Sequence, residues 1–411
     1  MADYKVLSRK YRPKKLKDVI GQGFSTKALN NAFVLNKIAH AFIFTGIRGV
    51  GKTTIARIIA MGLNCEKEKS PTANPCGSCN NCLQILNDRY EDVLEIDAAS
   101  HTGVDDVREI ISSLKYRPAK GSFKVFIIDE VHMLSNSAFN ALLKTIEEPP
   151  SYVKFIFCTT ELNKIPITIV SRCQRYDLKR VLVEDISLFL KEIINLEGIQ
   201  TSQKVINIIA RCSGGSIRDS LTILDQCLLG SEDNLIDLEQ VYQTVGITNN
   251  QTLLGLFYQI ISGKMKISLE KTKELYQNGA EPKQIIEDLL RLNYNLILYT
   301  VKKEKKLDDY YDEDMLKLIL EKCNLPFLNQ IWQMLITGKE EMHKVNHPIE
   351  ALEILVVRLA YTCKLPSLEE VVDIVKDRKN SINLDVNDKE EIGDDIRKIL
   401  DIFPEGKILK Q

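Results

Sequence analysis

Residues Gly46–Thr53 read Gly-Ile-Arg-Gly-Val-Gly-Lys-Thr, a complete G-x-x-x-x-G-K-[ST] phosphate loop. A short apolar run, Ala41–Phe44, precedes the loop and predicts a buried strand. A helical pattern follows it, with four apolar residues spaced for one face: Ile55, Ile58, Ile59 and Leu63. Because the strand and the helix that the motif requires are both expected, we interpret the segment as a nucleotide-binding loop rather than a glycine-rich turn.

The chemistry of this loop predicts how it would hold a nucleoside triphosphate. Glycines let successive backbone N–H groups turn toward a polyphosphate, and the helix N-terminus adds partial positive charge. Lys52 is expected to reach the β- and γ-phosphates, and the Thr53 hydroxyl to ligate Mg²⁺. The loop residues expected to bind the nucleotide are Gly46, Gly49, Val50, Gly51, Lys52, Thr53 and Thr54.

The composition is that of a globular protein with several domains. The chain has 411 residues, of which 44% are hydrophobic and 27% charged, and this length predicts two to four domains. No apolar run approaches the ~18–20 residues that cross a bilayer, and the N-terminus lacks a signal-peptide pattern, so we expect a cytoplasmic protein with no membrane partner. The net charge of −1 excludes a chain that binds nucleic acid through its overall charge. Residues 5–17 form a basic arm that could contact phosphates, although a solvated surface segment is the more common explanation.

The pattern of elements changes near residue 180. Before it, strand-like runs alternate with helical stretches, which predicts a parallel α/β sheet; the runs are Ala41–Thr45, Val93–Asp97, Lys124–Asp129 and Val153–Thr159. After it, amphipathic helices are expected over Asp185–Glu197, Gln203–Cys212 and Ser216–Leu229, and longer helices over residues 250–363. Ligands of parallel sheets bind beyond the carboxyl ends of the strands, where Asp97, Asp129 and Thr160 fall.

A second phosphate-site element lies in Phe126–Glu130. This apolar run ends in two acids, the Walker B pattern. Asp129 is expected to hold Mg²⁺, directly or through water, and Glu130 to orient or deprotonate the attacking water. His132 follows closely and is interpreted as structural, because Glu130 already fills the role of the base. A helix is predicted over Asn136–Glu147, capped by Ser135.

Four cysteines predict a metal site. Cys65, Cys76, Cys79 and Cys82 form C-x10-C-x2-C-x2-C, and four thiolates complete a tetrahedral Zn²⁺ site with no open position. The zinc is therefore expected to be structural. An iron–sulfur cluster is a weaker alternative. The remaining alternative is that the four cysteines are unrelated buried thiols that bind no metal.

Five strings give the segment His40–Arg180 a specific resemblance. They are AFIFTGIRGVGKTTIAR, PCGSCNNC, EIDAASHTGVDDVR, VFIIDEVHMLSNSAFNALLKTIEEPP and IPITIVSRCQR. The segment resembles the gamma/tau family of bacterial DNA polymerase III clamp-loader subunits, which are AAA+ ATPases. The phosphate loop alone is unspecific, whereas the inserted cysteine loop combined with Ser-Arg-Cys is selective. The match is dense over residues 1–245 and thin beyond.

The resemblance implies roles for further residues. Arg172 of Ser-Arg-Cys is similar to the arginine finger, which acts in trans on ATP held by a neighbouring subunit. Thr160 is similar to the first sensor and Arg218 to the second, which reaches from the lid domain to the phosphates. Arg12 and the segment that ends at Gln22 resemble the residues beside the adenine.

The resemblance also implies an architecture and a function. The expected parts are an α/β AAA+ ATPase domain (1–179) with a Cys₄ zinc module (65–82), a helical lid (180–245), an all-helical oligomerisation collar (246–365) and an acidic C-terminal extension (366–411). The implied function is ATP-driven loading of a sliding clamp onto primed DNA. The implied partners are copies of the chain itself, the delta and delta-prime subunits, the clamp, and primer-template DNA recognised by shape, with the polymerase and the helicase reached through a longer form.

Two other functions stay open at this point. The chain could be a non-hydrolysing scaffold of the same complex, although intact Lys52, Thr53, Asp129 and Glu130 argue against that. It could also be another AAA+ DNA motor, such as a branch-migration helicase, although the cysteine loop and the Ser-Arg-Cys string disfavour it.

Overall fold

A computed structural model describes residues 5–68, 71–100, 103–114, 116–231, 234–245, 250–302 and 313–362. The chain divides into two compact units, residues 1–247 and 248–411. The acidic extension expected over 366–411 lies outside the described residues.

The first unit is built on a five-stranded sheet in the order β2-β3-β4-β1-β5. All four pairings between neighbouring strands are parallel. The strands are β1 (Ala41–Thr45), β2 (Val93–Asp97), β3 (Lys124–Asp129), β4 (Val153–Thr159) and β5 (Gln174–Asp177). The four strands predicted from sequence are confirmed with their bounds. Each is a short apolar run, and β1, β3 and β4 are almost wholly buried.

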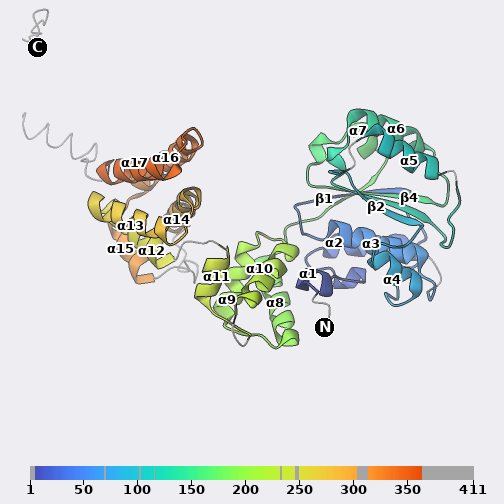
Figure 1. The fold of residues 1–411 in the computed structure, drawn as a ribbon, viewed down its shortest axis with the longest axis horizontal. Coiled ribbons are helices and arrows are strands. Elements are labelled where there is room, and N and C mark those ends of the chain that lie inside the picture. The colour runs from blue at the N-terminus through green and yellow to red at the C-terminus, as the bar shows by residue number, and fades with distance from the viewer. Residues whose placement is uncertain are drawn as a thin grey trace, which may run out of the picture. The chain divides into compact units, whose positions relative to one another are not determined.

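Helices cover both faces of this sheet (Figure 1). One face packs against α2 (Gly23–Val34), α3 (Lys52–Asn64) and α4 (Asn80–Leu86). The other packs against α5 (Val104–Ser113), α6 (Asn136–Glu147) and α7 (Ile167–Val170). Short 3₁₀ turns occupy Leu16–Asp18 (η1), Val131–Met133 (η2) and Leu162–Lys164 (η3). Both layers exclude water from the central strands, which leaves the strand ends as the accessible part of the sheet.

The predicted helices around the sheet occur for the predicted reasons. The four apolar residues spaced along α3 are at most 1% exposed, so the face expected from their spacing is the buried one. The Ser135 hydroxyl accepts the N–H of Ala138 and caps α6.

A helical subdomain follows the sheet within the first unit. It contains α8 (Val183–Glu197), α9 (Gln203–Cys212), α10 (Ile217–Leu229) and α11 (Leu238–Val245), with a short parallel pair, β6 (Gln200–Thr201) and β7 (Leu235–Ile236). The N-terminal α1 (Leu7–Lys10) packs on α10. The Leu7 backbone N–H donates to the Asp225 carboxylate at 3.2 Å, which fixes the start of the described chain to the subdomain.

The described part of the second unit is all-helical. Its helices are α12 (Asn250–Ile261), α13 (Met265–Gln277), α14 (Pro282–Lys302), α15 (Glu313–Lys322), α16 (Leu325–Met342) and α17 (Pro348–Thr362). They share one hydrophobic core. The Asn293 amide, which is fully buried, donates to the Leu328 carbonyl at 2.9 Å and joins α14 to α16.

Among the described helices, none is long and apolar enough to cross a membrane.

Candidate nucleotide and metal sites

The predicted phosphate-site residues meet at the carboxyl edge of the sheet. The loop Gly46–Thr53 leaves β1, Asp129 ends β3, and Thr160 follows β4. Since β1, β4 and β3 are neighbours in the sheet, residues 76 positions apart come into contact: the Thr53 hydroxyl donates to Asp129 Oδ2 at 3.0 Å. The two side chains expected to hold Mg²⁺ therefore lie together.

The loop conformation needs its glycines. Gly46, Gly49 and Gly51 have φ values of 147°, 79° and 107°, which lie outside the range that residues with a Cβ adopt readily. A Cβ on Gly46 would lie 2.6 Å from the Leu178 carbonyl oxygen. The motif thus encodes a backbone path that other residues could not follow.

Lys52 is held against the carbonyls of its own loop. Its Nζ donates to the carbonyl oxygens of Gly46 at 2.8 Å and Ile47 at 3.0 Å, and the residue is 5% exposed. Burial lowers the pKa of Lys52, while the charge of Glu130 opposes that shift. The ammonium is therefore partly desolvated, which strengthens its attraction for an anion placed beside it.

Glu130 adopts an unusual backbone conformation next to Asp129. Its φ of 46° and ψ of 43° are left-handed, a region that non-glycine residues occupy rarely and at functional sites. Its N–H donates to Asp129 Oδ1 at 3.0 Å, and its Oε2 accepts the Thr160 hydroxyl at 3.1 Å. The residues predicted as the base and the first sensor are thus joined by a direct hydrogen bond.

The helical subdomain contacts the loop through the start of α10. The backbone N–H of Arg218 donates to the Gly49 carbonyl at 3.3 Å. Ser216, which caps α10, is 1% exposed and lies so close that a Cβ on Gly49 would be 2.0 Å from its Oγ. The Arg218 side chain itself is exposed.

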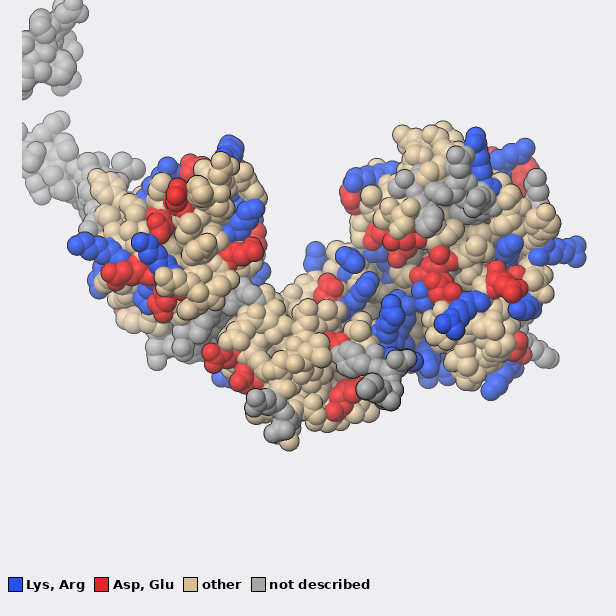
Figure 2. Space-filling model, viewed as in Figure 1, with Lys and Arg blue, Asp and Glu red and all other residues tan. Residues whose placement is uncertain are grey.

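Arg12 lies in a basic environment. Figure 2 shows Lys and Arg side chains gathered in the region of α1 and α10 on the face in view. Burial lowers the pKa of Arg12, and the nearby charges of Arg57, Arg218 and Arg9 add to that shift against Glu95. An excess of positive charge around a half-buried guanidinium favours an anionic ligand.

Gln22 uses its whole side-chain amide on the backbone. Its Nε2 donates to the Lys179 carbonyl at 2.7 Å, and its Oε1 accepts the Lys179 N–H at 3.1 Å. Gln22 is 3% exposed, so its side chain fastens the start of α2 to the segment that joins β5 to α8. The sequence contained no signal for this pairing.

Arg172 is not brought to the phosphate loop of its own chain. It precedes β5, whose first residue, Gln174, pairs with Phe42 near the start of β1, whereas the loop begins after Thr45 at the other end. Its guanidinium pairs with Glu147 at 2.6 Å and is 37% exposed. Arg172 thus lies at the edge formed by the amino ends of the strands, whereas Lys52 lies at the carboxyl edge.

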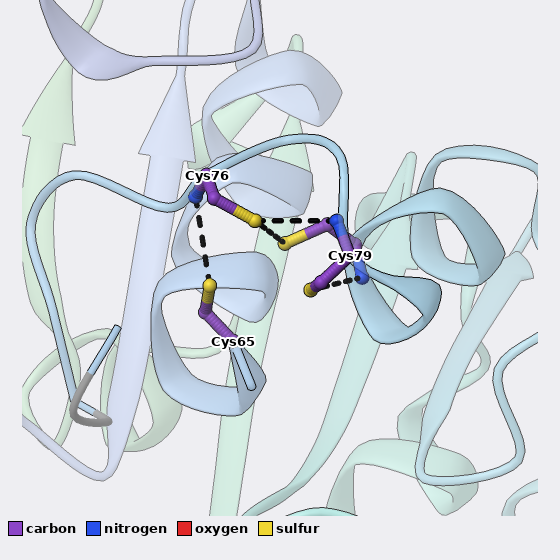
Figure 3. A group of neighbouring side chains, drawn as sticks. Cys65, Cys76 and Cys79 are labelled. Atoms are coloured by element: carbon purple, nitrogen blue, oxygen red, sulfur yellow. Dashed lines mark hydrogen bonds between the residues drawn. The ribbon is translucent and has the colours of Figure 1, made fainter. Parts of the chain in front are cut away.

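The four predicted metal ligands converge. Figure 3 shows Cys65, Cys76 and Cys79 facing one another, and the four sulfur atoms, including that of Cys82, lie within 4.8 Å of one another. Sulfurs around a tetrahedral zinc are about 3.8 Å apart at the usual Zn–S length, so the group fits a Zn²⁺ ion with little adjustment.

Backbone donors favour thiolates in this cluster. The N–H groups of Ser78 and Cys79 donate to Cys76 Sγ at 3.4 and 3.2 Å. Burial raises the pKa of Cys76, but these donors outweigh it and lower the pKa to about 6. Burial and the neighbouring thiols raise the pKa of Cys82.

One group near the site escaped the sequence reasoning. Arg57 on α3 donates to Glu95 on β2 at 2.6 Å and to the Leu86 carbonyl at 3.0 Å. The only signal for it was a charged residue inside an otherwise apolar helix. His132, which the sequence analysis interprets as structural, contacts Thr159.

Three family models match the chain. Residues 21–182 match the delta subunit of DNA polymerase III, residues 185–232 the ATPase lid domain of DNA polymerase III clamp-loader subunits, and residues 236–375 domain III of DNA polymerase III subunits gamma and tau.

Curated relatives carry names from the same complex. DNA polymerase III subunit gamma of Buchnera aphidicola subsp. Baizongia pistaciae is 36% identical over 87% of this chain and 97% of its own length. The tau subunits of Bacillus subtilis and Escherichia coli are each 38% identical over 87% and 90% of this chain. The chain spans 64% and 57% of the length of those two relatives.

Solved structures are more distant. The Holliday junction branch migration motor of Thermotoga maritima shares 22% identity over 61% of this chain and 79% of that one, with a TM-score of 0.43. A clamp-loader delta protein of Bacillus subtilis shares 14% identity over 82% and 99% of the two chains, with a TM-score of 0.37. Likeness at this level carries no argument about function.

Proposed function

The chain belongs to the gamma/tau family of bacterial DNA polymerase III clamp-loader subunits, which are AAA+ ATPases, and we propose that it uses ATP to load a sliding clamp onto primed DNA. The observation that carries this proposal is the arrangement of the phosphate site. Lys52, Thr53, Asp129 and Glu130 share one edge of the sheet, while Arg172 lies at the opposite edge of the same chain.

Each residue of the phosphate site has a chemical role in this proposal. The backbone of Gly46–Thr54 cradles the phosphates and Lys52 neutralises their charge. Thr53 and Asp129 would hold Mg²⁺, which would neutralise charge on the phosphates. Glu130 orients the attacking water, and Thr160 holds Glu130 or the γ-phosphate. Arg218, at the first turn of α10, reaches the phosphates when the lid closes.

Arg12 and Gln22 have weaker support as nucleotide residues. The positive surroundings of Arg12 suit an anionic ligand. The side-chain amide of Gln22 is committed to Lys179, so its contribution to the adenine pocket is one of shape.

Hydrolysis is proposed to require two subunits. Arg172 supplies charge stabilisation to ATP bound by a neighbour, because a finger at the far edge of the sheet cannot serve its own Lys52. ATP binding then favours the clamp-binding state, and hydrolysis on DNA releases the clamp. The partners are copies of this chain, the delta and delta-prime subunits, the clamp and primer-template DNA, with the polymerase and helicase reached by longer forms.

Zinc and the domain layout complete the proposal. Zn²⁺ is held by Cys65, Cys76, Cys79 and Cys82 as a structural ion. The ATPase domain comprises residues 1–179, the lid 180–245 and the oligomerising collar 246–365, and the complex works in the bacterial cytoplasm. A non-hydrolysing scaffold is the competing reading, and the intact phosphate site disfavours it.

The decisive experiment measures ATP hydrolysis by the reconstituted complex with and without clamp and primed DNA. We expect clamp and primed DNA together to stimulate ATP hydrolysis. We also expect hydrolysis to be lost when wild-type protein is assembled with an excess of Arg172→Ala protein. Arg175→Ala is the matched control, since Arg175 lies three residues on and pairs with Asp177 within its own strand. A full rate at every site in the Arg172→Ala mixture would exclude the trans assignment, and an absent wild-type rate would favour the scaffold.

A further inference from the structure

His132 is held by residues on the neighbouring strand. It lies in η2, two residues after Glu130, and its side chain is 6% exposed. Its Nδ1 is 3.0 Å from Thr159 Oγ1, the last residue of β4, which is fully buried. The contact joins the turn after β3 to the turn after β4.

The contacts around Thr159 indicate how the ring is held. Thr159 Oγ1 accepts the N–H of Glu161 at 3.0 Å and shares a hydrogen bond with His132 Nδ1 at 3.0 Å. The other ring nitrogen, Nε2, lies 3.5 Å from Glu161 Oε1. The ring and the two residues that flank Thr160 thus form one closed set of contacts.

Thr160 lies between Thr159 and Glu161 in the chain and forms a hydrogen bond with Glu130. Its hydroxyl donates to Glu130 Oε2 at 3.1 Å, and His132 Nδ1 is 3.5 Å from the same oxygen. Glu130 also has left-handed φ and ψ, a conformation that persists only where the surroundings enforce it. The position of the carboxylate therefore depends on where the Thr159–Glu161 turn is fixed.

We propose that His132 is a positioning residue for ATP hydrolysis: through Thr159 it fixes the turn that carries Thr160, and so sets where the Glu130 carboxylate lies. This rests on the proposed function, in which Glu130 orients the attacking water. It does not require His132 to transfer a proton. It also differs from a purely structural role, which would affect folding and nucleotide binding but not the catalytic step alone.

The test compares three substitutions in the reconstituted complex with clamp and primed DNA. An Asn side chain can place a polar atom where Nδ1 lies, whereas Gln reaches the Nε2 position. We expect His132→Ala to lower kcat about 10-fold or more, the usual scale for removing an orienting partner, with the KM for ATP within about 2-fold. His132→Asn should recover most of kcat, and His132→Gln should not.

A second variant covers the case in which histidine variants fold poorly. Thr159→Val keeps the buried shape and removes the hydroxyl, so it should reproduce the loss of kcat at unchanged KM. Met133→Ala, at a neighbouring residue that is 46% exposed, is the control and should keep wild-type rates. Melting temperatures are measured for all variants.

Three outcomes would overturn the inference. The first is a wild-type kcat in His132→Ala. The second is equal recovery by Asn and Gln. The third is a fall of kcat, nucleotide binding and melting temperature together in both His132→Ala and Thr159→Val. A wild-type complex that does not hydrolyse ATP would remove the proposed function and this inference together, whereas normal wild-type hydrolysis with unaffected variants would remove this inference alone.

Discussion

Gly49 is a residue at which the phosphate loop and the lid subdomain are in close contact. Its φ is 79°, and a Cβ would lie 2.0 Å from Ser216 Oγ, itself buried. We expect Gly49→Ala to lower the free energy of unfolding of the first unit by about 1–3 kcal/mol, because the left-handed conformation and the close approach both disfavour a side chain. Chemical denaturation of the purified chain measures it.

Gly23 offers a matched control for that substitution. It is the first residue of α2, and a Cβ there would meet nothing within 4 Å. Gly23→Ala should change the free energy of unfolding by less than about 0.5 kcal/mol. Equal effects of the two substitutions would show that the contact between Gly49 and Ser216 carries no stability.

Among single residues, the sequence predicted those for which the ligand's chemistry fixes both the residue type and the spacing. A polyphosphate with Mg²⁺ needs backbone N–H groups, a cation and hard oxygen ligands, and Lys52, Thr53 and Asp129 occupy the spacing that supplies them. Gln22 is different, because its partner Lys179 lies 157 positions away. No local pattern marks a contact that only the folded chain creates.

The cysteine loop is the element whose stability depends most on a metal. Cys82 is fully buried within α4 and Cys65 is the C-cap of α3, so a bound Zn²⁺ would fix the end of the phosphate-loop helix. We expect one Zn²⁺ per chain, and loss of that ion with a lower melting temperature in Cys82→Ser or after chelation, since metal binding adds to folding free energy. Metal analysis and thermal unfolding measure both.

Cys173→Ser provides the comparison, because Cys173 is half-buried and lies outside the cluster. Its zinc content should equal that of the wild type. A Cys82→Ser protein with full zinc content and an unchanged melting temperature would contradict the assignment of the metal site.

The anchor of α1 on α8 should depend on pH. Lys10 Nζ lies 2.6 Å from Glu197, and the Tyr11 hydroxyl also donates to that carboxylate. The hydrogen bond from Lys10, then that from Tyr11, lowers the pKa of Glu197 below 4.5. A folded-state pKa below the unfolded value means that the contact stabilises the fold above about pH 4.5 and is lost as pH falls through the lowered pKa.

Glu197→Gln should therefore lower the denaturation midpoint slightly at pH 7, by an amount that shrinks as the pH falls toward 3. The effect is small because both partners are partly exposed. Glu192→Gln, at an exposed site on the same helix, should match the wild type at both pH values. A difference between Glu197→Gln and wild type that persists at low pH would contradict the linkage.

Elements were predictable where burial follows the strand or helix period. The four central strands are apolar runs because helices cover both faces of the sheet. Strand β5 was missed because Gln174, Arg175 and Asp177 are exposed and Tyr176 alone is buried. An edge strand of four residues carries too few buried positions to produce a pattern.

For the whole molecule, the placement of Arg172 predicts a weak ATPase in the isolated chain. Lys52 and Arg172 lie at opposite edges of one sheet, and an arginine supplied in trans contributes on the order of 10³-fold or more. We therefore expect the isolated chain to hydrolyse ATP on the order of 10³-fold more slowly than the assembled complex. Rates of the purified chain and of the complex, compared at saturating ATP, decide this.

Substituting Arg172 should not slow the isolated chain further, because the finger has no ATP to act on there. A fast isolated chain that Arg172→Ala inactivates would instead place the finger in cis.

The sequence by itself determined the phosphate loop, the acidic strand end, the cysteine set and the alternation that builds a parallel sheet. Each depends on residue type at fixed short spacing, so it survives without knowledge of the fold. Tertiary structure alone decided that Thr53 meets Asp129, that Gln22 binds Lys179, that His132 lies beside Thr159, and that Arg172 lies at the opposite edge of the sheet from Lys52. These contacts depend on strand order and register, which set distances between residues far apart in the chain and leave no mark on local spacing.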